Sequence, residues 1–242
     1  YVHGGGGSGG SVAISCLSID GSGTVSAAGG KGLTWGSSGA GGRVAIAYDA
    51  AAMQAAPLPA LVFSAAAGLG GSWSQNSNIW PATPALFDSE PGSLWFTDGQ
   101  FLTRLGTETF RHSGYWVQES GTQWDLPSLK MENAWLAFPN PGFVLNIAGD
   151  MSIKGTDPRI HKATFTNGTL KCGGNLTVDK AKIDMMTSFD GSPTVDVTGN
   201  MSMLNAAVID MRLGGASPTE PGFEGVVEVG GAMSLAGNSI IY

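Results

Sequence analysis

A nine-residue phrase that recurs four times constrains the fold of this chain more than any other feature of the sequence. The copies are LNIAGDMSI (145–153), LKCGGNLTV (170–178), VDVTGNMSM (195–203) and VEVGGAMSL (227–235). Their central glycines are Gly149, Gly174, Gly199 and Gly231, which follow one another at intervals of 25, 25 and 32 residues. Repetition at such a period is typical of a solenoid, in which each repeat buries its apolar face only against its neighbours.

Within each copy the apolar residues lie two and four positions on either side of the glycine. This alternation predicts β-strands rather than one face of a helix. We interpret the glycine as the corner between two strands of one coil, on the inward parity, where a side chain would collide with the core. Asp150, Asn175 and Asn200 follow the corner, and stacking would align them into a polar ladder with a spacing of about 4.8 Å.

A second repeated segment, AKIDM (181–185) and AVIDM (207–211), indicates at least one further strand in each coil. A 25-residue period accommodates three short strands with their turns, and no stretch between the phrases has the 3.6-residue period of a helix. The sequence therefore predicts an all-β fold, a right-handed parallel β-helix, rather than βαβ units.

The N-terminal region has a repeat of its own, GGSVAIS (9–15) and GGRVAIA (41–47). We interpret the glycine run 4–10 as turns. For residues 29–42 two alternatives stay open, a flexible linker or close-packed turns.

The central region is the least regular and is rich in tryptophan. It predicts a short helix at 50–56, ended by Pro57, and four strands. The strands are expected near 58–63, 93–97, 115–118 and 134–137. The resulting domain prediction is Gly-rich solenoid coils over 1–49, irregular coils or an insertion over 50–140, and regular coils of about 25 residues over 141–242.

Composition and motifs exclude several classes of function. The chain has 19 acidic residues against 12 Lys and Arg and no basic stripe, so we expect no nucleic acid partner. Cys16 and Cys172 lack metal-ligand spacing and take inward positions, where we expect buried thiols, with a disulfide as the alternative. The glycine runs lack the features of nucleotide-binding loops, and no apolar stretch approaches ~20 residues. We expect no cofactor, no metal and no membrane span in this segment.

Asp184 and Asp210 are the strongest candidates for catalysis, because the repeated segment stacks them on adjacent coils beside Lys180, Lys182 and Arg212. Carboxylates about 5 Å apart would suit a retaining glycosidase. No histidine lies close to them in sequence, and polar residues after a strand are also the ordinary surface of a solenoid. We therefore predict no catalytic residues and no enzyme, with a polysaccharide lyase or glycosidase as the enzymatic alternative.

Other candidate sites concern the surface. Trp80, beside Pro81 in a polar context, is the predicted carbohydrate contact, whereas Trp95 and Trp135 are predicted to be core. Three sequons begin at Asn167, Asn175 and Asn200, which makes these residues candidate glycosylation sites in a secretory pathway.

Residues 4–48 and 143–236, with their GGS-apolar strands, the Gly-Ser-Gly turn at 21–23 and Gly-(Asp/Asn)-apolar-(Ser/Thr) phrases, resemble Gly-rich β-helix segments of large bacterial cell-surface proteins. The resemblance implies a pectin-lyase-like superhelix outside a cell, in an adhesin, surface layer or fibre. We therefore expect an extracellular or cell-surface structural module of about nine coils, part of a fibre, stalk or coat. It would self-associate or continue in a longer chain. The alternative is a carbohydrate-binding or polysaccharide-cleaving β-helix protein.

Overall fold

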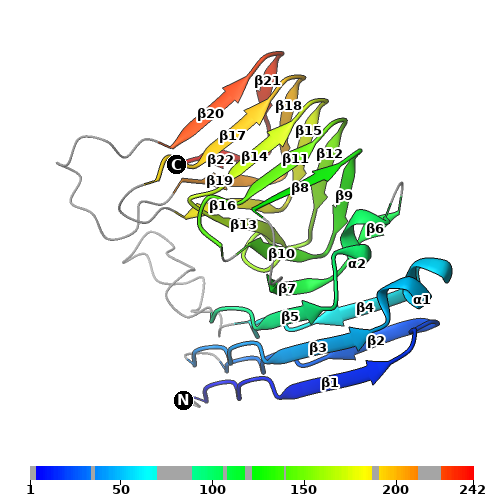
Figure 1. Ribbon diagram of the computed structural model, residues 1–242. Helices are drawn as coiled ribbons and strands as arrows, with labels where there is room; N and C mark the ends of the chain where they lie inside the picture. Colours follow the sequence, from blue (N-terminus) through cyan, green and yellow to red (C-terminus); the bar gives the residue numbers. More distant parts are fainter. Residues whose placement is uncertain are drawn as a thin grey trace. The chain divides into compact units, whose positions relative to one another are not determined.

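A computed structural model of the chain describes residues 4–33, 36–69, 89–105, 108–117, 122–138, 140–186, 191–211 and 225–242 (Figure 1). The chain forms two compact units. Unit 1 comprises Tyr1–Asp98 with His112–Gln118, and unit 2 comprises Gly99–Arg111 with Glu119–Tyr242. The predicted boundaries after residues 49 and 140 concern the regularity of the coils and stay a prediction.

Unit 2 is built almost entirely of short parallel strands. A helix, α2 (Gln100–Thr103), precedes them. The strands are β6 (Thr109–Phe110), β8 (Gln123–Leu126), β9 (Leu129–Glu132), β10 (Trp135–Phe138), β11 (Val144–Ile147), β12 (Met151–Lys154), β13 (Lys162–Thr166), β14 (Thr169–Cys172), β15 (Leu176–Asp179), β16 (Lys182–Met186), β17 (Thr194–Val197), β18 (Met201–Leu204), β19 (Val208–Asp210), β20 (Val226–Val229), β21 (Met233–Leu235) and β22 (Ile240–Ile241).

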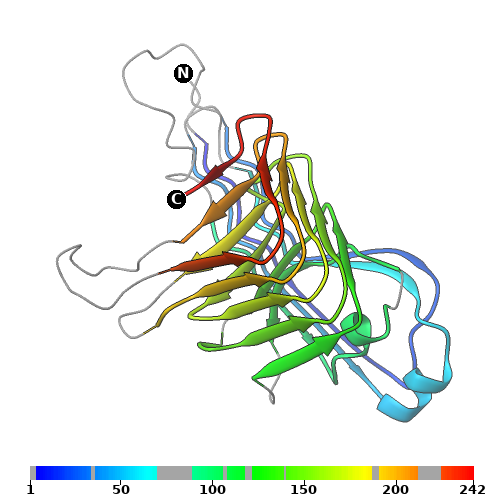
Figure 2. The same ribbon diagram turned by 90° about the horizontal axis from the view of Figure 1, so that it is seen from above.

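Successive groups of three strands form the coils of unit 2, and equivalent strands stack into three parallel sheets (Figure 2). The first sheet runs β8–β11–β14–β17–β20, the second β6–β9–β12–β15–β18–β21, and the third includes β10–β13–β16–β19–β22. Leu145 pairs with Leu170, which pairs with Val195, which pairs with Val227, so the repeated phrase stacks in register. The predicted all-β parallel β-helix is confirmed, and its handedness stays a prediction. The three-strand coils begin at β8, before residue 141.

The interior of unit 2 contains the alternating apolar residues of the phrase. Leu145, Ile147, Met151 and Ile153 are buried, as are the residues paired with them on the next two coils. Aromatic rings fill the earlier coils, where Phe138 stacks on Phe143 with ring centroids 4.2 Å apart. The alternation of apolar residues in the repeated phrase therefore predicts which side chains are buried, because successive side chains of a strand point to opposite faces.

In the described part of unit 1, the first two layers hold two strands each instead of three. Its elements are β1 (Ser11–Cys16), β2 (Ser22–Ser26), β3 (Arg43–Tyr48), α1 (Ala50–Ala55), β4 (Ala60–Ser64), β5 (Ser93–Phe96) and β7 (Ser113–Val117). One sheet pairs β1, β3, β5 and β7 in parallel, and β2 pairs with β4. The predicted helix is present as α1, where the Asp49 side chain accepts a hydrogen bond from Ala52 N at 2.7 Å, an N-cap.

Residues 4–10 are bonded laterally to other segments and are not turns, so their interpretation as turns is wrong; the described residues 29–33 and 36–42 are bonded in the same way and are not a flexible linker. Gly6 and Gly9 donate backbone hydrogen bonds to Ser37 and Ala40, at 2.9 and 2.8 Å. Gly30 and Leu33 donate to Gly7 and Gly4 in the opposite direction, both at 2.8 Å. Bonds that recur at every third residue match the threefold repeat of a polyproline II helix, which has no internal hydrogen bonds and leaves its backbone groups open to lateral partners. The glycine segments are therefore joined side by side by backbone hydrogen bonds, and two of them lead directly into strands β1 and β3.

Candidate functional site

The four predicted corner glycines lie between the first and second strands of successive coils. Gly149 lies between β11 and β12, and Gly174, Gly199 and Gly231 lie at the same place one, two and three coils later. Gly149 N donates to Pro127 O at 2.9 Å, Gly174 N to Gly149 O at 2.9 Å, and both later corners repeat the bond at 3.0 Å. The corners are thus joined by a continuous backbone hydrogen-bond chain.

The reason for glycine at the corner differs from the prediction. A Cβ atom on Gly149 would lie 2.8 Å from Pro127 O, and one on Gly199 would lie 2.5 Å from Gly174 O. The collision is with the backbone of the preceding corner, not with the core, and Gly149, Gly174 and Gly199 are half-buried rather than interior. Close stacking of corners along the solenoid axis therefore excludes a side chain here.

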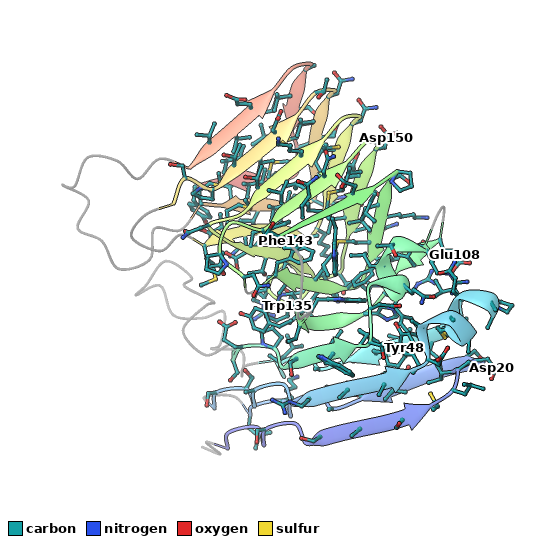
Figure 3. All side chains as sticks on the ribbon, viewed as in Figure 1. Asp20, Tyr48, Glu108, Trp135, Phe143 and Asp150 are labelled. Atoms are coloured by element: carbon teal, nitrogen blue, oxygen red, sulfur yellow. The ribbon has the colours of Figure 1, made fainter. Side chains whose placement is uncertain are left out.

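A ladder of polar side chains runs beside these glycines, and Asp150, where it begins, is labelled in Figure 3. Asp150 Oδ1 accepts from Asn175 N at 2.7 Å, and Asn175 Oδ1 accepts from Asn200 N at 3.0 Å. Asn200 Oδ1 accepts from Ala232 N at 2.8 Å, where the ladder ends because alanine has no acceptor. Each carbonyl or carboxylate oxygen satisfies a backbone donor one coil further on, which fixes the coil-to-coil register.

The predicted glycosylation sites divide into two groups. Asn175 and Asn200 are exposed and belong to this ladder, with Asn175 Nδ2 also donating to Asp150 Oδ1 at 3.2 Å. Asn167 follows β13 with φ 46° and is half-buried. Glycosylation of all three stays a prediction.

The most concentrated chemistry of unit 2 is an ion-paired cluster on the outward face of the third sheet. Lys182 Nζ lies 2.7 Å from Asp210 Oδ2 and 3.4 Å from Asp184 Oδ2, and Lys162 Nζ lies 3.6 Å from Asp184 Oδ2. Only 3% of the Asp184 side chain is exposed, against 12–14% for the other three. Lys162 Nζ also lies 3.8 Å from the ring centre of Trp135, whose Nε1 donates to Thr164 Oγ1 at 3.1 Å.

Strand register explains how the sequence builds this cluster. Asp184 pairs with Asp210 across β16 and β19, as the repeated segment predicts, and Lys162 pairs with Lys182 across β13 and β16. Lys162 and Thr164 were missed by the sequence reading, although their i, i+2 spacing on β13 matches Lys182 and Asp184 on β16. Each carboxylate is neutralised by lysine, and their low exposure favours a structural ion pair over an accessible acid–base pair.

Of the two tryptophans predicted to be core, one is buried and one is not. Trp135 is buried, as predicted, and its ring lies under Lys162 Nζ on the outward side of the third sheet. Trp95 is half-buried on the face of β5 opposite to Leu94 and Phe96, which are the core residues there, so its assignment to the core is wrong. Trp80, the predicted carbohydrate contact, lies outside the described residues.

Two histidines have environments that the sequence did not reveal. His112 is buried among the rings of Phe63, Phe96 and Trp116, and its Nδ1 accepts from Phe63 N at 3.2 Å. Burial lowers the pKa of His112 to about 4. His161 Nδ1 accepts from Thr156 N at 3.0 Å, and partial burial lowers its pKa, opposed by the nearby charge of Asp157. Both rings therefore act as neutral acceptors of backbone N–H groups.

The two thiols are free. Cys172 is buried, as expected, and burial raises its pKa, whereas Cys16 is only half-buried. The described ranges contain no group of three His, Cys, Asp or Glu residues arranged to hold a metal ion. Within the same ranges, no helix has both the length and the hydropathy needed to cross a membrane.

No family model, curated protein or solved structure matches the chain. Its function is therefore inferred from its own residues.

The last coil of unit 2 is uncovered on its outer side. Met233 and Leu235 pair with Met201 and Met203 of the preceding coil. The earlier pair is completely buried, whereas Met233 is 42% exposed and Leu235 is 47% exposed. Strands β20, β21 and β22 each end the order of their sheet. This coil therefore presents apolar side chains together with an open row of backbone donors and acceptors.

Proposed function

We propose that the chain is an extracellular structural β-solenoid module, part of a cell-surface fibre, stalk or coat, which associates end to end with a neighbouring copy. The single observation that carries this proposal is the uncovered last coil of unit 2. The residues there repeat the interior pattern of the earlier coils, and no described residue covers them on their outer side. Extracellular location rests on the resemblance to bacterial surface β-helices.

Covering the last coil has a favourable free energy. Full burial of a large aliphatic side chain contributes about 1.5–3 kcal/mol, so each half-exposed residue of the pair Met233 and Leu235 offers about 1 kcal/mol. Ile240 and Tyr242 on the third side of the coil are 40% and 70% exposed and add to this. A neighbouring strand would also pair the edge backbone groups. Contacts between unlike ends extend into a filament when the rotation between copies does not close a ring.

Sedimentation velocity over a wide range of concentrations tests the proposal. The wild-type chain should form larger species as its concentration rises. Leu235→Asp places a charge in the open end of the coil and should shift the material to monomer. Ser234→Asp, one residue away on the outward face, is the matched control and should associate as the wild type does.

Two results would count against association through this coil. The first is a wild-type chain that stays monomeric at the highest concentration. The second is a Leu235→Asp chain that associates as strongly as the Ser234→Asp chain. Because the wild-type measurement needs no substitution, the test holds even if the aspartate at position 235 unfolds the last coil.

The alternative function, a carbohydrate-binding or polysaccharide-cleaving β-helix, has weaker support. The carboxylates of Asp184 and Asp210 both lie within 3.4 Å of Lys182 Nζ and are largely buried. A glycan array combined with a reducing-sugar assay separates the two functions. A signal in either assay would favour the alternative, and a structural module should give none.

A further inference from the structure

The first layer of unit 1 has an edge that no described residue covers. Its backbone groups are equivalent to those of the second layer, which the first layer covers. This edge consists of Gly4–Gly10 followed by β1. The next layer consists of Gly36–Gly42 followed by β3, and its register is set by Ser11 pairing with Arg43. Gly7 and Gly10 are therefore equivalent to Gly39 and Gly42.

The glycines of the inner layer are required by close packing. A Cβ atom on Gly39 would overlap the carbonyl oxygen of Gly7, and one on Gly42 would overlap that of Gly10. A Cβ atom on Gly92, in the following layer, would overlap that of Gly42. By contrast, a Cβ atom on Gly7 or on Gly10 would meet nothing within 4 Å. Packing among the described residues therefore does not require glycine at these two edge positions.

The backbone hydrogen bonds provide an independent second observation. Gly39 N donates to Gly30 O, and Gly42 N donates to Ala27 O, both at 2.8 Å. The equivalent N–H groups of Gly7 and Gly10 make no hydrogen bond within the described ranges, and both residues are exposed.

The backbone carbonyl groups of the first and second layers differ in the same way as their N–H groups. Ser37 O and Ala40 O accept from the N–H groups of Gly6 and Gly9. Their equivalents, the carbonyl groups of Gly5 and Ser8, accept no hydrogen bond from any described residue. The edge therefore carries donors and acceptors at the threefold spacing that a further layer would satisfy.

The strand that continues this edge is also uncovered on one side. Val12 and Ile14 of β1 are half-buried, whereas their partners Val44 and Ile46 of β3 are completely buried. Strand β1 ends the order of its sheet. A layer that covered the glycines and ran on beside β1 would bury these side chains as well.

We infer that this edge binds a glycine-rich segment of a separate polypeptide, one that carries glycine at every third residue and runs directly into a strand of alternating apolar residues. The segment would lie parallel to Gly4–Gly10 and β1, because only a parallel arrangement matches glycine to glycine and strand to strand at once. Recognition is strand addition, in which backbone hydrogen bonds supply affinity and the absent Cβ atoms supply selectivity. The inference concerns unit 1 alone and does not depend on association through the last coil of unit 2.

A peptide taken from the chain itself is the natural probe. Residues 36–49 carry both the glycine repeat and the apolar strand, and a fluorescein-labelled peptide of this sequence would be titrated with the full chain by fluorescence anisotropy. The peptide should bind saturably, and a scrambled peptide of the same composition should not.

Substitution of the edge glycines makes the test specific. Gly7→Ala and Gly10→Ala introduce methyl groups into empty space, so the fold should be unchanged, but each methyl would overlap a carbonyl oxygen of the incoming segment. The double variant should lose affinity by about tenfold or more. Gly5→Ala is the matched control, since its methyl would contact only Ser37 at an ordinary 3.8 Å, and it should bind as the wild type does.

Three outcomes would overturn the inference: no saturable binding of the peptide, equal binding of the scrambled peptide, or undiminished binding by the double variant. The circular dichroism spectrum and melting temperature of the double variant should equal those of the wild type. A lower melting temperature would contradict the empty space seen at Gly7 and Gly10.

Discussion

Acidification should destabilise unit 1 through one buried side chain, His112. The ring is enclosed by Phe63, Phe96 and Trp116 and accepts a hydrogen bond from Phe63 N. Burial lowers its pKa from the ordinary 6.5 to about 4, because a charged imidazolium would lose its hydration and would replace the acceptor with a second donor.

The direction of the effect follows from proton linkage. Between pH 6.5 and 4 the unfolded chain binds a proton at this position and the folded chain does not, so stability falls as the pH falls through this window. A difference of about 2.5 in pKa corresponds to a total loss of about 3 kcal/mol below pH 4. At pH 5 the loss relative to pH 7 should be about 2 kcal/mol.

Urea denaturation at pH 7 and pH 5, followed by tryptophan fluorescence, measures the free energy of unfolding. Other groups also titrate in this range, so the comparison is with His112→Asn, whose side-chain oxygen can still accept from Phe63 N but which does not titrate there. The wild type should lose about 2 kcal/mol more than the variant between the two pH values. Equal losses would refute the reasoning, as would an NMR titration in which the His112 ring gains its proton near pH 6.5.

Three further predictions concern unit 2. Replacing Asp184 by Asn removes the carboxylate that lies 3.6 Å from Lys162 Nζ and leaves Lys182 paired with Asp210, and it should lower the free energy of unfolding in urea by about 2 kcal/mol, whereas Asp196→Asn on the first sheet should change it by less than about 0.5 kcal/mol. Gly174→Ala should lower the same quantity by about 1–3 kcal/mol, since the methyl would press on the preceding corner. Iodoacetamide should alkylate Cys16 well before Cys172, whose pKa is raised by burial; mass spectrometry of timed samples would show equal rates if this is wrong.

Glycine has two structural roles in this chain, and both depend on contact between layers. At Gly174 a Cβ atom would strike the corner of the previous coil, and at Gly39 it would strike the neighbouring extended segment. In neither place is a positive φ angle the reason. Such glycines therefore indicate that two backbone segments lie in contact. Gly7 and Gly10 are the equivalent glycines at the edge where we propose that another layer binds.

Much of the architecture of unit 2 was predictable because its determinants are local. The alternation around Gly149 assigns Leu145, Ile147, Met151 and Ile153 to the interior, since consecutive side chains of a strand must point to opposite faces. Repetition at 25 residues then requires equivalent strands to stack, because one coil cannot bury its apolar face alone. Three strands in each coil and the placing of the glycines at corners follow from the same pattern.

Only the tertiary structure decided which groups meet across coils and layers. The position of Lys182 between Asp184 and Asp210 depends on lateral register and on side-chain direction, neither of which a single strand specifies. The glycine segments are the extreme case. Without Cβ atoms their sequence permits turn, coil or extended chain almost equally, so the choice is made by hydrogen bonds from neighbouring segments, which exist only once the layers have assembled.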